Sequence, residues 1–249
     1  MERPLLSVNT VTGITEQDYS RTPEYIRVAN SIAQVAYESM YVIDYYKKNF
    51  LYVSDNPLFL CGLTSKEVMG MGYGFYRSHV PEDEIEMLLE INAAAFGFLN
   101  RQPIEDRNLI SISCDFHIKN GNGNQILINH KLTPLAMDPS GHLWLAVCCV
   151  SLSSHDKPGH IIARKAGNSA YWSYGLSSKR WAKVEKTLLA DAEKEVLQLS
   201  AQGMTIEDIA IKLNRSKDAI KSRRRAIFEK LGVKSISEAI TFALNYKLI

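Results

Sequence analysis

The chain has 249 residues, of which 46% are hydrophobic and 22% are charged, and its formal net charge is +2. This length and apolar content allow one large or two ordinary globular domains, and we expect two. No stretch approaches the ~18 uncharged apolar residues of a membrane-spanning helix, and the opening residues lack a basic segment followed by an apolar one. The sequence therefore predicts a cytoplasmic protein with no membrane partner.

The charge is divided unevenly along the chain. Residues 1–176 contain 14 Lys and Arg against 18 Asp and Glu, whereas residues 177–249 contain 15 against 9. Lys and Arg side chains that bind phosphates release the counterions of the polyanion, which favours binding. The basic tail therefore indicates a polyanionic partner. A solvated basic face without a partner fits the charge equally well, and the charge alone does not decide between them.

The four cysteines predict neither a metal site nor a disulfide framework. Cys61, Cys114, Cys148 and Cys149 include no C-x-x-C pair, and neighbouring residues on a strand point to opposite faces. Free cysteine is among the most buried residue types. We expect four reduced thiols in the core.

The first elements expected are a helix and a hairpin. Thr22 is a candidate N-cap before Pro23, and apolar residues then recur at helical spacing as far as Ala36. Residues 40–46 and 50–54 are short β-branched and aromatic runs, and a polar turn separates them. This pattern predicts a β-hairpin.

Helices are expected next. Pro57 and several glycines limit residues 55–75 to short helical turns. The acidic residues 82–84 suit the first turn of a longer helix, because carboxylates stabilise a helix N-terminus. The predicted inner stripe of this helix contains Ile85, Leu88, Leu89 and Phe96.

Three strands in a meander complete this domain. Apolar and polar side chains alternate in residues 109–119, which is typical of a half-buried strand. Residues 120–124 and 138–141 are rich in Asn, Gly, Asp and Pro and predict turns. Between and after these turns, residues 125–137 and 142–152 form the second and third strands, and the third is nearly continuously apolar.

The order of these elements resembles the PAS fold, a small sensor module. The resemblance covers about residues 38–152 and is most visible in residues 43–70, which look like the family's opening hairpin and the passage after it. It implies a domain that binds a small molecule or another PAS domain. Pro57 follows Asn56, where the flavin photosensors of this family have a reactive Cys, so we do not expect light sensing.

Two histidines and four aromatic residues are candidates for a cofactor site. His79 and His117 could ligate haem iron, but His117 falls on the polar phase of its strand and favours a surface histidine. No catalytic or phosphate-binding motif occurs in residues 1–155. We therefore expect no enzyme, no catalytic residue, no metal and no cofactor, and the residues that bind a ligand stay unidentified. The aromatic residues that could line a cavity, or simply fill the core, are Tyr73, Phe75, Phe96 and Trp144.

Residues 156–185 are expected to connect this domain to the tail. Turn signals at residues 158–159 and 167–168 bracket a β-like run, and aromatic residues follow. Because aromatic residues favour burial, we predict a packed β-hairpin here rather than a disordered tether.

The tail, residues 186–249, has the signals of four helices. The first covers about residues 191–202 before Gly203, and the second follows Thr205, a candidate N-cap. The third begins after Ser216 and the fourth near Ser237. Buried positions are expected at Val196, Leu197, Leu199, Ile209, Ala210, Leu213, Ile220, Ile227 and Leu231.

Two short helices joined by a tight turn, the second one basic, are the geometry that lays a recognition helix in the DNA major groove. Thr205 and Ser216 stand at helix N-termini, where backbone N–H groups can meet phosphates. Arg223 and Arg224 lie on the flanks of the third helix, from which long side chains reach the DNA backbone. The outward stripe opposite the buried isoleucines consists of Lys217, Asp218, Lys221, Ser222 and Arg225.

The tail resembles the LuxR (GerE-type) helix-turn-helix family. It matches the family patterns E-x-E-V-L-x-L-x-x-x-G at residues 193–203, I-A-x-x-L at 209–213 and K-x-x-R-x-x-I-F-x-K-L-G-V at 221–233. The resemblance implies that Lys221, Ser222 and Arg225 occupy base-contacting positions and that the fourth helix is the usual dimer surface. Departures are Ala192, where an Arg usually precedes Glu193, and Ala219-Ile220 in place of the usual Thr-Val.

The fold predicted as a whole is α+β, with a PAS-like antiparallel sheet and flanking helices followed by an all-α four-helix LuxR-type domain. Its expected parts are a lead (1–22), a sensor or dimerisation domain (23–155), the connector (156–185) and the DNA-binding domain (186–249). The function predicted is a homodimeric, sequence-specific transcription regulator that binds double-stranded DNA, with a small-molecule ligand and RNA polymerase as further partners. Alternatives are an autoinducer-responsive quorum-sensing regulator and a haem or redox sensor with a DNA-binding tail.

Overall fold

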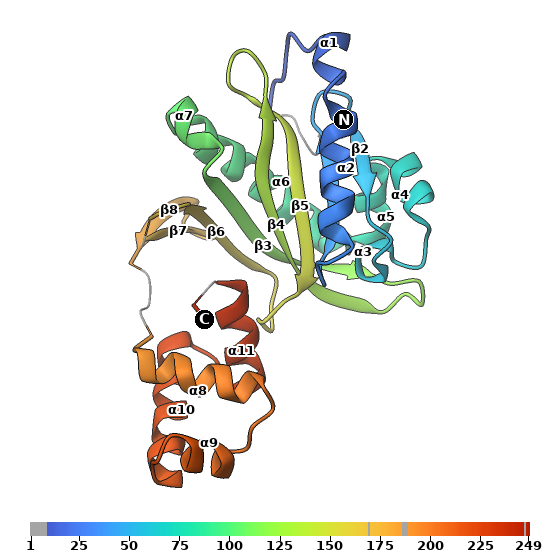
Figure 1. The fold of residues 1–249 in the computed structure, drawn as a ribbon. Coiled ribbons are helices and arrows are strands. Elements are labelled where there is room, and N and C mark those ends of the chain that lie inside the picture. The colour runs from blue at the N-terminus through green and yellow to red at the C-terminus, as the bar shows by residue number, and fades with distance from the viewer. Residues whose placement is uncertain (1–8, 169, 186–188, 247) are drawn as a thin grey trace. The chain divides into compact units, whose positions relative to one another are not determined.

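The computed structural model describes residues 9–168, 170–185, 189–246 and 248–249. The chain divides into two compact units, one that ends at Val184 and one that begins at Glu185 (Figure 1). The first unit is a sheet with helices and the second is entirely helical. The predicted α+β class is confirmed.

An antiparallel sheet of eight strands forms the centre of the N-terminal unit, in the order β2-β1-β5-β4-β3-β6-β7-β8. The first five strands in this order, with helices between β2 and β3, have the PAS arrangement that the resemblance predicted. The strands are β1 (Ser39–Asp44), β2 (Asn49–Val53), β3 (Ile110–Lys119), β4 (Gln125–Met137), β5 (Leu143–Leu152), β6 (Gly159–Lys165), β7 (Tyr171–Gly175) and β8 (Arg180–Val184).

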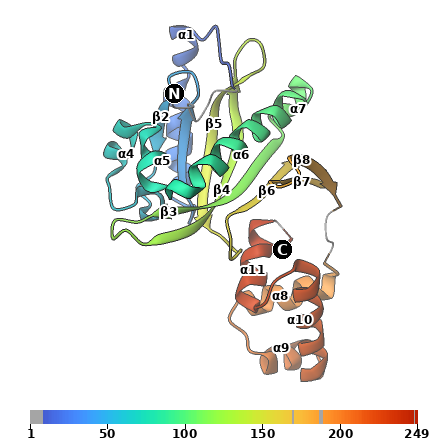
Figure 2. The ribbon, with the colours of Figure 1, turned by 180° about the vertical axis from the view of Figure 1, so that it is seen from behind.

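The longest helix of this unit, α6 (Glu82–Asn100), lies across one face of the sheet (Figure 2). The main core fills the space between that face and the helices, and a smaller cluster around Trp144 packs against Tyr19 and Tyr25. The other helices are α1 (Glu16–Tyr19), α2 (Thr22–Ala33), α3 (Pro57–Leu60), α4 (Ser65–Met71), α5 (Gly74–His79) and α7 (Ile104–Arg107).

Strand β3 follows its predicted alternation except at Asp115, a polar-phase residue that is completely buried. Its apolar residues from Ile110 to Ile118 are all buried, as a half-buried strand requires. The turn after it also follows the prediction, because the Asn120 side chain accepts hydrogen bonds from the N–H groups of Asn122 and Asn124 at 3.0 and 2.9 Å. Asn side chains commonly close turns in this way.

The start of the first long helix differs from the prediction. Thr22 is not the N-cap of α2 but its first residue, and its hydroxyl donates to the carbonyl of Tyr19 at 2.8 Å. The cause is an additional helical turn, α1, within the expected lead. Thr15 caps that turn in a capping box with Asp18, and the turn ends just before α2 begins.

Residues 159–184, within the expected connector, form three strands that extend the sheet. β6 pairs with β3, β7 pairs with β6, and β8 pairs with β7. The aromatic side chains of β7 and β8 pack against the main core, which gives these strands an apolar face to bury.

The C-terminal unit consists of four helices: α8 (Asp191–Ala201), α9 (Ile206–Lys212), α10 (Lys217–Leu231) and α11 (Ile236–Asn245). Thr205 caps α9 and Ser216 caps α10 through their side chains, as predicted. The fourth helix starts slightly earlier than predicted because Ser235 is its N-cap. Across the described part of the chain, no helix combines the length and the apolar character needed to cross a membrane.

Candidate ligand cavity and nucleic-acid interface

A cavity lies between α6 and the sheet in the N-terminal unit. It has two adjoining lobes of about 40 and 60 Å³ that share lining residues from β3, β4 and α6. One water needs ~10–15 Å³ on this measure, so the smaller lobe holds only about three to four waters and the larger about four to six. The lining is largely apolar and includes Ile91, Ala95, Leu99, Leu132 and Leu143.

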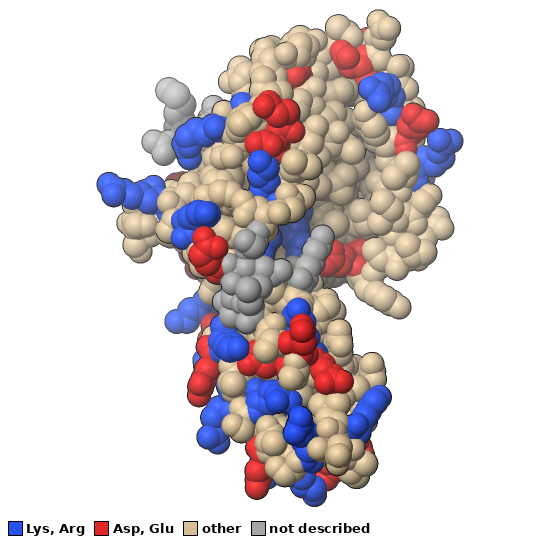
Figure 3. Space-filling view, turned by 60° about the vertical axis from the view of Figure 1, so that its left-hand side comes forward, with Lys and Arg blue, Asp and Glu red and all other residues tan. Residues whose placement is uncertain are grey.

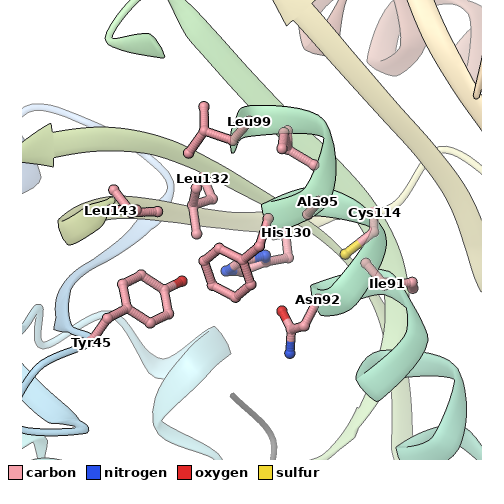
Figure 4. Close-up of a pocket in the computed structure, with 11 residues that line it drawn as sticks. Tyr45, Ile91, Asn92, Ala95, Leu99, Cys114, His130, Leu132 and Leu143 are labelled. Atoms are coloured by element: carbon pink, nitrogen blue, oxygen red, sulfur yellow. The ribbon is translucent and has the colours of Figure 1, made fainter. Parts of the chain in front are cut away.

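The polar groups of the cavity come mainly from aromatic side chains. The hydroxyl of Tyr41 lies 2.5 Å from Nε2 of His130 and 2.5 Å from the hydroxyl of Tyr76. Since Tyr41 has one proton, it donates to one of these partners and accepts from the other. The hydroxyl of Tyr73 is buried without a hydrogen-bond partner. Figure 4 shows Tyr45, Asn92 and His130 around the smaller lobe.

The cavity groups are uncharged at neutral pH. Desolvation lowers the pKa of His130 to about 4, so its imidazole is neutral. Burial also raises the pKa of Tyr41, Tyr73 and Tyr76 far above the ordinary tyrosine value, which keeps all three phenols protonated. A bound molecule would therefore meet hydrogen-bonding dipoles and apolar surface.

Helix α10 presents the predicted outward stripe. Ile220 and Ile227 are completely buried, and Leu231 is buried with them. The arginines on the flanks, Arg223 and Arg224, are half-buried. The exposed stripe opposite these apolar residues consists of Lys217, Asp218, Lys221, Ser222 and Arg225. The predicted phase of the helix agrees with the structure.

Two lysines of this stripe pair with carboxylates on the same surface. Nζ of Lys217 lies 2.8 Å from Oε1 of Glu207, and Nζ of Lys221 lies 3.4 Å from Oδ1 of Asp218. All four side chains are more than half exposed. Such exposed pairs contribute little free energy, so phosphate or base contacts can replace them.

The N-cap residues of α9 and α10 are arranged differently. The carboxylate of Asp208 accepts from both the N–H and the hydroxyl of Thr205, at 3.0 and 2.6 Å. Ser216 instead accepts from the N–H of Ala219 at 3.2 Å, and no carboxylate bonds its hydroxyl among the described contacts. The N-terminus of α10 is thus less occupied by acidic groups than that of α9.

An ion pair holds α10 against α8. Glu193 is buried, and its Oε2 accepts from Nζ of Lys230 at 2.8 Å and from the N–H of Ala190 at 2.7 Å. Burial alone would raise the pKa of this carboxyl, but the hydrogen bonds from Lys230 and Ala190 outweigh it and hold the pKa below its usual value. This ion pair therefore connects α10 with α8.

The surface of the C-terminal unit has a mixed charge. In Figure 3, Lys and Arg side chains are spread over the visible face of this unit with Asp and Glu side chains between them. The face in view therefore has charges of both signs and no purely basic patch.

Residues 187–243 match the family model described as bacterial regulatory proteins of the luxR family. The match covers all of α8, α9 and α10 and most of α11. The C-terminal unit is a LuxR-type DNA-binding domain. A comparison with curated proteins found no match.

Solved structures provide further similarities. The chain is 19% identical to a phage VqmA in complex with DPO, over 95% of this chain and 92% of that one, with a TM-score of 0.34. It is 15% identical to the VqmA dimer of Vibrio cholerae, over 95% and 89%, with a TM-score of 0.35. The response regulator ChrA of a heme-sensing two-component system is 35% identical, but the match covers only 30% of this chain and 34% of that one, with a TM-score of 0.24.

The residues suggested for haem do not line the cavity. Nδ1 of His79 lies 3.0 Å from the carbonyl oxygen of Phe75, and Nδ1 of His117 lies 2.5 Å from Oε1 of Glu84. His117 is also only partly exposed, because α6 covers it through Glu84. The lobes are far smaller than a porphyrin, so the residues present do not fit this group.

The candidate aromatic residues are divided between cavity and core. Tyr73 and Phe96 contribute to the cavity lining, whereas Phe75 and Trp144 are core residues. All four cysteines are free, and no group of three or more His, Cys, Asp or Glu among the described residues could hold a metal ion.

Sequence reasoning missed the polar part of the cavity while it identified the stripe of the LuxR-type domain. Tyr41 and His130 are far apart in the chain, and they meet because β1 and β4 both pair with β5. The one available signal was a histidine in the middle of a predicted strand. The residues that contact this histidine cannot be predicted without the order of the strands in the sheet.

Proposed function

We propose that the chain is a sequence-specific transcription regulator that binds a pseudo-palindromic DNA site as a homodimer. The observation that carries the proposal is the division of α10 into a buried isoleucine face and an exposed face with Lys217, Lys221 and Arg225. Lys and Arg at such positions donate to guanine O6 and N7. Arg223 and Arg224 on the flanks, with the N-termini at Thr205 and Ser216, would contact phosphates. RNA polymerase as a partner stays a prediction.

The test is a DNA-binding assay with the full chain and an operator selected from random duplexes. Lys221→Ala should reduce discrimination between the operator and random DNA by about 1–3 kcal/mol, whereas Arg223→Ala should weaken both by similar factors. Lys194→Ala removes a cation of α8 outside the stripe and serves as the control. Equal binding of all three variants and the original chain would contradict the assignment of the stripe.

A fourth variant tests the acidic member of the stripe. Asp218→Asn removes the carboxylate that pairs with Lys221. Since this carboxylate also repels phosphates, the variant should bind random duplexes more tightly and lose part of its preference for the operator. Affinities measured at two salt concentrations separate this charge effect from a change in fold.

We further propose that the cavity binds a small uncharged ligand that controls DNA binding. The neutral state of His130 and the unpartnered hydroxyl of Tyr73 support a ligand with a hydrogen-bonding group and a compact apolar body. An ionised ligand would lose its hydration without meeting an opposite charge.

A thermal-shift panel with phenol, benzamide, benzoate and an acyl-homoserine lactone tests this ligand class. The neutral aromatic compounds should stabilise the protein, and Tyr73→Phe should reduce their effect. Stabilisation by benzoate alone would contradict the uncharged class. Stabilisation by the lactone alone would favour the autoinducer-responsive alternative.

A further inference from the structure

Helix α6 has one face toward the cavity and another toward the hairpin of β7 and β8. Ile91, Ala95 and Leu99 line the cavity at four-residue spacing, which places them on one side of the helix. At ~100° per residue, Glu90 lies on nearly the opposite side and Phe98 on the flank between them. The two faces are therefore parts of one rigid rod.

The hairpin contacts α6 through an aromatic and a charged cluster. The ring of Phe98 lies 4.7 Å from that of Trp181 and 5.4 Å from that of Trp172. The carboxylate of Glu90 accepts a hydrogen bond from the hydroxyl of Tyr174 at 3.2 Å and forms an ion pair with Lys179. These contacts attach both strands of the hairpin to the helix.

The sheet forms the cavity wall opposite α6, and it is harder to displace than the helix. β4 pairs with β3 on one edge and with β5 on the other, so a shift of Leu132 or His130 would disturb two ladders of hydrogen bonds. Helix α6 satisfies its backbone hydrogen bonds internally and meets the sheet through side chains. A molecule larger than the empty lobes therefore displaces α6 more easily than the sheet, since protein interiors are close-packed.

We propose that α6 transmits occupancy of the cavity to the β7–β8 hairpin, with Glu90 and Phe98 as the positioning residues. The hairpin ends at Val184 and the first helix of the LuxR-type domain begins at Asp191, so residues 185–190 are the covalent connection. A displaced hairpin therefore moves the point at which the chain leaves the N-terminal unit. The inference rests on the proposed function, because it explains how the ligand would alter DNA binding.

Cavity-filling substitutions replace the unidentified ligand in the test. Ala95→Leu fills the smaller lobe from α6, and Cys114→Met fills it from β3. In a Trp144→Phe background the hairpin contains the two remaining tryptophans of the chain, Trp172 and Trp181. Both fillers should change the emission and acrylamide quenching of these tryptophans, and Phe98→Leu should abolish the change. Unchanged emission with both fillers, or an equal change with Phe98→Leu, would overturn the proposal.

DNA binding of the full chain provides the second readout. The fillers should change operator affinity by about fivefold or more, and Glu90→Lys should remove most of this change. The exchange Glu90→Lys with Lys179→Glu restores opposite charges and should restore the response. Glu86→Lys makes the same charge change at an exposed position one turn earlier, and it should leave the response intact.

The outcomes separate the two proposals. If every variant binds the operator and the fillers act equally with and without Glu90, the transmission through α6 is wrong and the regulator assignment stands. If neither the original chain nor any variant binds DNA, the proposed function fails, and the tryptophan emission alone decides whether α6 couples the cavity to the hairpin.

Discussion

Replacement of Glu193 by Gln should loosen the attachment of the recognition helix without a change of side-chain shape. Gln can still accept from the N–H of Ala190, but it loses the ion pair with Lys230. Hydrogen bonds to charged groups contribute about 1.5–3 kcal/mol, and the partial exposure of Lys230 argues for the lower end, about 1.5 kcal/mol. Because the pKa of Glu193 is lowered in the folded state, this stability is present above the unfolded pKa of about 4.3 and is lost as the pH falls through the folded value.

Hydrogen exchange of the full chain measures this loss for α8 and α10 directly. A loss of about 1.4 kcal/mol lowers protection tenfold when exchange follows the opening equilibrium, and peptides of the N-terminal unit serve as the internal reference. Lys230→Met completes a double-mutant cycle, in which the effect of Glu193→Gln should largely disappear. Equal losses with and without Lys230 would refute the ion-pair explanation and leave only the cap at Ala190.

Two further predictions concern the N-terminal unit. The pKa of His130 is about 4, so between pH ~6.5 and ~4 the unfolded chain binds a proton that the folded chain does not. The free energy of unfolding should therefore decrease by up to about 3 kcal/mol as the pH is lowered through this range. Urea midpoints measured at pH 7 and at pH 4.5 should differ less in His130→Gln than in the original chain. Gly62→Ala places a Cβ 2.8 Å from Cα of Gly121 at a φ of +90°, so it should destabilise the protein by about 1–3 kcal/mol. The control Gly70→Ala, within α4 and with no atom within 4 Å of its Cβ, should stabilise it by about 0.5–1 kcal/mol in the same urea experiment.

The sequence predicts the LuxR-type domain almost completely because its structure is specified locally. Three of the four helices described, α9, α10 and α11, begin at a polar N-cap, whereas α8 begins after Ala190. Each helix buries residues that recur every three or four positions, so a stretch of ten to fifteen residues contains the information for one helix. Ile220 and Ile227 fix the phase of α10, and that phase alone decides which side Lys221 occupies. Leu213, which was predicted to be buried, is only partly buried. The shift from Ser237 to Ser235 at the start of α11 reflects two serines that both satisfy the rule for an N-cap.

The N-terminal unit is predictable in its strands but not in its cavity. A period-two pattern marks β3, because one face of that strand is largely buried, whereas β4 follows from the turns on either side of it and its burial does not alternate. The contact of Tyr41 with His130 depends instead on the order of β1, β5 and β4, which connects residues far apart in the chain. The ion pair of Glu90 with Lys179 could not be predicted either, since no local sequence pattern indicates that α6 contacts the later hairpin.

Carboxylates beside the recognition lysines make physical sense for a protein that selects one site among many. Glu207 and Asp218 reduce the net attraction of α10 for any phosphate backbone, which lowers the affinity common to all sequences. In the proposed function, contacts between Lys221 and base edges form only at the operator, so the carboxylates weaken these contacts less. In the proposed function, affinity and discrimination depend on different side chains of α9 and α10. We expect the carboxylates of Glu207 on α9 and Asp218 on α10 to raise the ratio between operator and random DNA even though they lower both affinities.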